Sequence, residues 1–152
     1  MAIKKNISVR LGVADLRRIK EIANRLDVKE SEIFRYAVKS LATRLLPLLN
    51  RQLSGISMLV ALLESGEDLL HHFEFDTQQL QRLINTGLAD GQRPVDPEDI
   101  DMLAIAIINP DYIAARISEK TGIRVDPNFA FGALQKYLFR KYQVRQYVLV
   151  EN

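Results

Sequence analysis

Three side chains near the start of the chain have the clearest capacity for specific hydrogen bonding. Asn6, Ser8 and Arg10 occupy alternate positions in the sequence. An amide donates and accepts, a hydroxyl does both through one oxygen, and a guanidinium donates from a rigid planar fork. Because alternate residues of an extended chain share one face, these groups are predicted to form a single polar row.

The residues between them predict the element that carries this row. Ile7, Val9 and Leu11 alternate with the polar positions, as in a short strand with one buried face. A lone strand has no ladder partner, and a unit of about 45 residues buries too little apolar surface to fold alone. Two copies that pair antiparallel about a two-fold axis meet both needs, so we expect an obligate homodimer.

The outer face of such a two-stranded ribbon suits the major groove of double-stranded DNA. Arginine can bond to O6 and N7 of guanine, asparagine to N6 and N7 of adenine, and serine to either kind of edge. We therefore predict base contacts from Asn6, Ser8 and Arg10, with Lys4 extending the ribbon toward the DNA backbone.

Two amphipathic helices are predicted after the strand. Apolar residues recur every three or four positions over 13–26 and again over 33–45. Pro47 lacks an N–H and clashes with the preceding turn, so the second helix should end just before it. A domain boundary near this proline divides the chain into 1–46 and 47–152.

Residues 4–11 (Lys-Lys-Asn-Ile-Ser-Val-Arg-Leu), the helix after them, and residues 28–37 (Val-Lys-Glu-Ser-Glu-Ile-Phe-Arg-Tyr-Ala) resemble the ribbon-helix-helix family of transcriptional regulators, of the Arc and MetJ type. The resemblance implies an intertwined dimer whose ribbon enters the major groove while the start of the second helix clasps the DNA backbone. It assigns that clasp to Lys29, Glu30 and Ser31, although Lys29 stands where the family usually has a Ser or Thr cap.

The charge distribution favours a polyanionic partner for the beginning of the chain. The 152 residues carry 21 Lys and Arg against 19 Asp and Glu, a net charge of +2. Residues 1–50 hold 11 of those cations and 5 of the anions (+6), which leaves 10 and 14 (−4) for residues 51–152. The acidic remainder argues against a second DNA surface.

The rest of the chain is predicted to be mostly helical. A narrow apolar seam predicts a helix over 49–63 that ends at Gly66. Residues 89–95 form a loop, and residues 144–150 form a short terminal strand that could pair with 123–125. The predicted helix caps are Asp76, Asp96, Asn109 and Asp126, the last three directly before a proline.

The predicted fold class is therefore mostly α: an N-terminal ribbon-helix-helix dimer, a helical C-terminal domain and a short terminal strand. Without cysteine the chain has no disulfide or thiol chemistry, and no apolar stretch approaches the roughly 18 residues of a membrane span. No phosphate loop, strained nucleophile turn or metal-ligand spacing is present. We expect a soluble cytoplasmic protein, not an enzyme, with no cofactor and no metal.

Three groups of side chains that could suggest a ligand or metal site are better explained by structural roles. His71 and His72 are adjacent, so on a helix they point about 100° apart and suit the surface better than a metal site. The carboxylates Asp96, Glu98, Asp99 and Asp101 suit a helix N-terminus. The late aromatic residues, Phe129, Phe131, Tyr137, Phe139, Tyr142 and Tyr147, suit core or interface packing.

The leading hypothesis for function is a sequence-specific DNA-binding transcriptional regulator, acting as a repressor. The alternative is an antitoxin or plasmid-maintenance adaptor whose C-terminal domain binds a protein partner. A third is a structural dimer with no nucleic-acid partner. The sequence leaves open whether residues 47–152 bind an effector, another protein or another dimer, and whether the oligomer is larger than a dimer.

Overall fold

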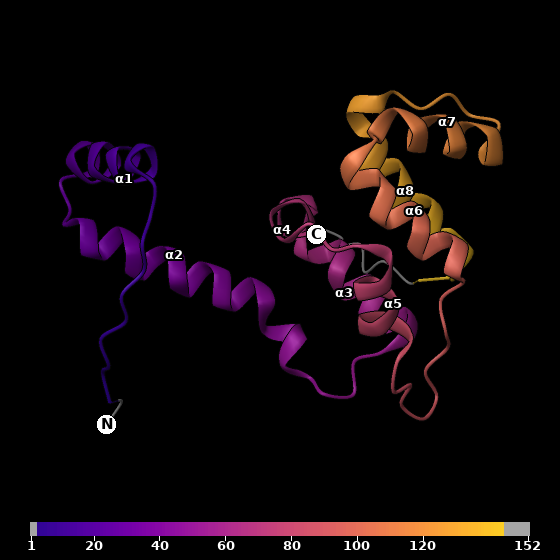
Figure 1. Ribbon diagram of the computed structural model, residues 1–152, viewed down its shortest axis with the longest axis horizontal. Helices are drawn as coiled ribbons and strands as arrows, with labels where there is room; N and C mark the ends of the chain where they lie inside the picture. The colour runs from indigo at the N-terminus through magenta and orange to yellow at the C-terminus, as the bar shows by residue number, and fades with distance from the viewer. Residues whose placement is uncertain (1–2, 145–152) are drawn as a thin grey trace, which may run out of the picture. The chain divides into compact units, whose positions relative to one another are not determined.

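Every regular element in the described part of the chain is helical. The computed structural model describes residues 3–144, and its helices are labelled in Figure 1. The chain divides into two compact units, Met1–Arg44 and Leu45–Asn152, which we call the N-terminal unit and the C-terminal unit.

The N-terminal unit is built around two helices, α1 (Val13–Leu26) and α2 (Glu30–Leu45), the second of which ends one residue beyond the unit. Both helices predicted from apolar spacing are confirmed. Pro47 lies in the short 3-10 helix η1 (Leu46–Leu49), so α2 ends before the proline as expected.

A tight turn separates α1 from α2. Asp27 adopts a left-handed conformation with φ of 55°, and its N–H donates to the carbonyl of Asn24 at 3.3 Å. The next N–H, that of Val28, donates to the carbonyl of Ala23 at 3.0 Å. These two bonds form a Schellman motif, which satisfies the last carbonyls of α1 and reverses the chain toward α2.

The predicted ribbon is wrong for the chain as the structure describes it. Residues 3–12 have no regular secondary structure, and no described segment forms a ladder with residues 7–11. Alternation of apolar and polar residues shows which side chains can share a face, but a strand also needs a hydrogen-bonding neighbour. The ribbon-helix-helix fold expected for residues 1–46 is therefore corrected to two helices preceded by an irregular segment.

The predicted strand pair at the other end is also corrected. Residues 123–125 and Val144 contain no strand, and residues 145–150 lie outside the described residues. The backbone around 123–125 is held by side chains of α7 (Pro110–Thr121) instead. Ser118 Oγ accepts the Val125 N–H at 2.9 Å, and Thr121 Oγ1 accepts the Ile123 N–H at 3.3 Å.

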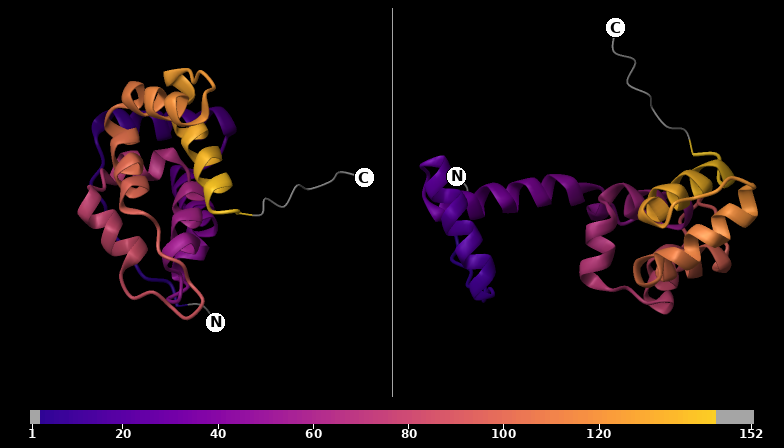
Figure 2. Two further views of the ribbon diagram at one scale, coloured as in Figure 1. Left: turned by 90° about the vertical axis from the view of Figure 1, so that its right-hand side faces the viewer. Right: turned by 90° about the horizontal axis from the view of Figure 1, so that it is seen from above.

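The C-terminal unit packs its helices around one core. Besides η1 and α7, its elements are α3 (Gly55–Ser65), α4 (Glu67–Phe73), α5 (Thr77–Asn85), α6 (Pro97–Ile108), η2 (Pro127–Phe129) and α8 (Ala130–Lys141). Within the unit, α6 and α8 lie side by side and α7 crosses one end of the pair, as the orange and yellow helices show in Figures 1 and 2. Fully buried Leu and Ile side chains from α3, α4, α5, α6, α7 and α8 fill the interior.

Three of the four helix starts predicted from capping residues are confirmed. Asp76 and Gln79 form a complete capping box at the start of α5, and Pro97 and Pro110 are the first residues of α6 and α7. After Asp126, the 3-10 turn η2 comes first and α8 begins only at Ala130.

The helix predicted over 49–63 begins later than expected, at Gly55, and ends at Gly66 as predicted. A contact distant in sequence determines this start: the Ile56 N–H donates to the carbonyl of Arg93 at 3.0 Å. Gly55 has φ of +56°, and a Cβ there would lie 2.0 Å from the Arg93 carbonyl oxygen. Only glycine permits this approach of the loop to the helix.

Candidate nucleic-acid interface

The N-terminal unit leaves most of its apolar side chains in solvent. Among its described residues only Ala23 is buried, with 1 % of its surface exposed, and Ile19, Ile33 and Phe34 are half-buried. Large apolar side chains are exposed on the segment before α1 and on both helices. They include Ile3, Ile7, Val9, Val13, Leu16, Ile22, Leu26, Val38 and Leu41.

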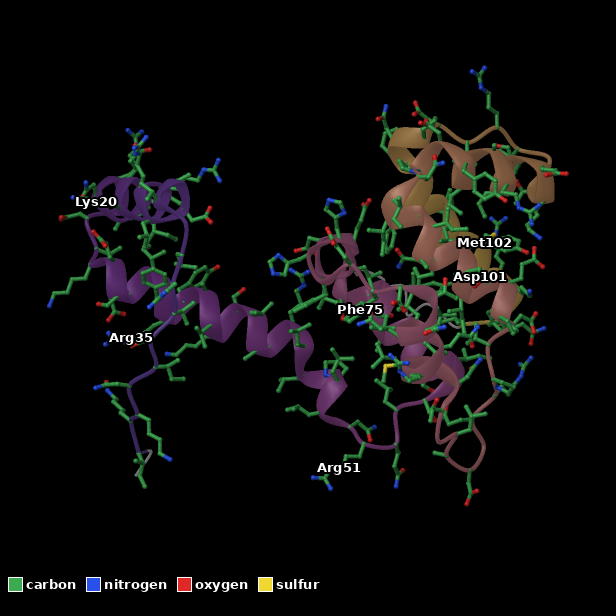
Figure 3. All side chains as sticks on the ribbon, in the orientation of Figure 1. Lys20, Arg35, Arg51, Phe75, Asp101 and Met102 are labelled. Atoms are coloured by element: carbon green, nitrogen blue, oxygen red, sulfur yellow. The ribbon has the colours of Figure 1, made fainter. Side chains whose placement is uncertain are left out.

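All Lys and Arg side chains described in this unit are exposed. Figure 3 labels two of them, Lys20 on α1 and Arg35 on α2. Arg18 pairs with Asp15 at 3.4 Å, and Arg35 pairs with Glu32. Exposed pairs one helical turn apart stabilise little, so these cations remain available to a polyanion.

The predicted base-contacting residues lie on the irregular segment before α1. Asn6, Ser8 and Arg10 are exposed, as is Lys4. Within the described residues no side-chain hydrogen bond holds any of them, and no second strand joins them into one surface. The structure therefore places these groups in solvent without assembling the predicted row.

The predicted backbone-contacting residues lie at the start of α2. The Lys29 carbonyl accepts the N–H groups of Glu32 at 3.0 Å and Ile33 at 3.4 Å, while Glu30 and Ser31 are exposed in the first turn. A lysine side chain cannot accept a hydrogen bond, so it cannot cap the helix. A helix start attracts anions through its free N–H groups, but the two glutamates of this turn oppose that attraction.

The sequence reasoning missed a buried polar network in the C-terminal unit. Asp99 has 1 % of its surface exposed, so it is more than a capping carboxylate at the start of α6. Tyr142 Oη donates to Asp99 Oδ2 at 2.5 Å and accepts the Asp96 N–H at 2.9 Å. Lys141 Nζ lies 2.7 Å from Asp99 Oδ2 and 2.8 Å from Asp96 Oδ2.

This network joins the start of α6 to the end of α8. Burial and the hydrogen bond to Asp99 raise the pKa of Tyr142. Burial opposes the charge of Lys141, but hydrogen bonds to Asp96 and Asp99 outweigh it and raise the pKa of that ammonium group. Both groups therefore keep their protons at neutral pH, and the network fits a structural role.

A second, solvent-exposed network lies along α6 and α7. Arg116 contacts Glu98 at 2.8 Å, and Lys120 contacts the same carboxylate oxygen at 3.0 Å. The hydrogen bond and charge of Lys120, followed by the charge of Arg116, lower the pKa of Glu98.

Within residues 3–144, no cluster of three or more His, Asp or Glu side chains is arranged to hold a metal ion. His71 and His72 are both exposed, as the sequence predicts. In the same part of the chain, no helix combines the length and apolar character needed to cross a bilayer.

No family model, curated protein or solved structure matches this chain.

Proposed function

We propose that the protein is a sequence-specific transcriptional regulator that binds double-stranded DNA through a homodimer of its N-terminal unit. The observation that carries the proposal is the coincidence of exposed cations and exposed apolar side chains on one small unit, in which Ala23 is the single buried residue among those that the structure describes. Apolar surface favours association with another protein surface, and cationic surface favours a polyanion. In this proposal the protein acts in the cytoplasm.

The apolar side chains support dimerisation. Complete burial of a fully exposed Val, Leu or Ile side chain contributes about 1.5 to 3 kcal/mol, and a half-exposed side chain contributes correspondingly less. Leu16, Val38 and Leu41 are among those available on the two helices. A second copy presents the same side chains, so a two-fold arrangement matches apolar surface to apolar surface.

The cations support DNA binding. Each phosphate that a lysine or arginine neutralises releases condensed counterions, so affinity should fall steeply as salt rises. We assign base contacts to Asn6, Ser8 and Arg10, whose amide, hydroxyl and guanidinium groups match base edges. We assign backbone contacts to Lys4 and to the start of α2, where Lys29, Glu30 and Ser31 lie.

Fluorescence anisotropy with the intergenic DNA upstream of the gene and a scrambled duplex, each at two salt concentrations, tests the proposal. Arg10→Ala should cost about 1 to 3 kcal/mol on the specific duplex and leave the helical content unchanged. The matched control is Arg82→Ala, which removes an equal charge from an exposed position on α5 and should have no effect. Equal affinity for both duplexes, or equal loss in both variants, would count against sequence-specific binding.

A second candidate function is an adaptor, such as an antitoxin, that captures a protein through its C-terminal unit. The observation that favours it is exposed apolar surface after α7, where Ile123 and Phe129 have 63 % and 72 % of their surface in solvent. Purification of the full chain from its native host distinguishes the two. One stoichiometric protein partner lost in Phe129→Ser supports the adaptor, and a homo-oligomer that binds the upstream DNA supports the regulator.

A further inference from the structure

A cavity of about 540 Å³ lies in the C-terminal unit, between the turn that joins α4 to α5 and the second half of α6. This volume falls within the range that holds small organic ligands in proteins. Apolar groups, including Phe75, Ile105 and Ile108, form part of its lining. The ionisable groups in the lining are His71, Glu74 and Asp76.

The charge of this lining is negative. Glu74 and Asp76 are exposed and directly flank Phe75 in sequence, and no described Lys or Arg lines the cavity. Neither carboxylate forms an ion pair with a described residue. Asp76 Oδ1 accepts the Gln79 N–H at 2.8 Å, and this capping bond at the start of α5 offsets only part of the carboxylate charge.

An aromatic ring lies between the two carboxylates in sequence. Phe75, labelled in Figure 3, stacks on Phe73 with ring centroids 5.7 Å apart and an interplanar angle of 21°. His72 packs edge-on against Phe73, with centroids 5.1 Å apart and an angle of 89°. Phe75 is half-buried and lines the cavity, where its ring offers a π surface that attracts cations.

We propose that this cavity binds a lipophilic organic cation. The apolar part of the ligand packs against the isoleucines of α6, and its positive charge lies near Phe75, Glu74 and Asp76. A neutral apolar ligand would displace water from the two carboxylates without compensation, and an anion would be repelled by them. The proposal concerns the C-terminal unit alone and does not depend on DNA binding.

A pair of ions of equal shape and opposite charge tests the proposal on the unmodified full chain. Tetraphenylphosphonium and tetraphenylborate present the same four phenyl rings, so a difference in affinity reports the charge preference of the site. Equilibrium dialysis should give saturable binding of one phosphonium ion per chain, at least about tenfold tighter than the borate. Equal or tighter binding of the borate, or phosphonium binding that does not saturate, would overturn the proposal.

Three variants locate the site. Glu74→Gln should weaken phosphonium binding about tenfold, because it removes a charge at the cavity without changing the shape of the side chain. Glu64→Gln is the matched control, since Glu64 is exposed on α3 and outside the lining, and it should change nothing. Ile108→Ser should weaken binding of both ions, because Ile108 contributes apolar lining rather than charge.

Circular dichroism of each variant accompanies the dialysis. Ile108 has 84 % of its surface exposed, so Ile108→Ser should preserve the fold. If Glu74→Gln and Glu64→Gln bind the phosphonium ion equally well, the carboxylate of Glu74 has no part in recognition and the proposed site is wrong.

Discussion

In the C-terminal unit, Leu103, Ile113 and Leu134 are completely buried, and helices distant in sequence supply that burial to one another. In the N-terminal unit, apolar residues recur just as regularly, but Ile7, Val9 and Val38 remain largely exposed. Apolar residues are therefore spaced equally regularly in the two units. Only the C-terminal unit contains the helices that bury its apolar faces. The contrast teaches that an amphipathic pattern specifies a face, while the partner for that face can lie outside the folded unit.

The largest loss of stability should come from a substitution in the core of the C-terminal unit. Leu103→Ala creates a cavity at a fully buried position on α6 and should lower the free energy of unfolding by about 3 to 4 kcal/mol. Leu41→Ala is the matched change in the N-terminal unit, where the side chain is half exposed, and should cost far less at low protein concentration. Urea unfolding measures both, and comparable losses would erase the distinction between the units.

The next largest loss of stability should come from a change in the buried network of Asp99, Tyr142 and Lys141. Asp99→Ala leaves Tyr142 and Lys141 without their shared carboxylate and should cost about 3 kcal/mol. Asp101→Ala, two residues further along α6, removes an exposed carboxylate and should change stability by less than about 0.5 kcal/mol. Thermal unfolding of the two variants separates the buried role from a general effect of acidic residues at this helix start.

A smaller effect is expected on self-association. Val38→Glu places a charge on the exposed apolar face of α2 and should weaken the proposed dimer about tenfold or more, which corresponds to about 1.4 kcal/mol. Ser40→Glu, on the same helix but off the apolar stripe, is the control. Sedimentation equilibrium measures the dissociation constant. If the two variants associate equally well, the apolar stripe of α2 is not the interface.

The smallest effect should be on the pH dependence of stability. The folded state lowers the pKa of Glu98, so its contribution to stability is present above the pKa of the unfolded chain and is lost as pH falls through the lower folded value. Because Glu98 is exposed, Glu98→Gln should flatten the acid limb of the stability profile only slightly. Urea unfolding midpoints across the acid range measure this, and a steeper acid limb in the variant would reverse the predicted sign.

Features with local causes could be predicted from the sequence. Apolar spacing gave the bounds of α1, and Pro47 marked the end of α2. The residues before Pro97 and Pro110 marked the starts of α6 and α7, although only Asn109 forms a side-chain capping bond and Asp96 does not. Each of these signals lies within about one helical turn of the boundary that it marks, so it can be recognised in the sequence alone.

Features that depend on distant residues could not be predicted in this way. The start of α3 depends on the Arg93 carbonyl, and the role of Asp99 depends on Tyr142, more than forty residues later. The cavity beside Phe75 exists only because α4, α5 and α6 meet. The predicted strand at residues 7–11 failed for the complementary reason, since its pattern is local but its ladder partner is not part of the described chain.

The link between Asp99 and the residues after α8 also bears on the order of events during synthesis. The carboxylates at the start of α6 cannot acquire their tyrosine and lysine partners until residue 142 has left the ribosome. The first two helices emerge long before that, with their apolar faces uncovered. In a nascent chain, the apolar faces of α1 and α2 are therefore exposed to solvent while the later portion of the chain is still being synthesised.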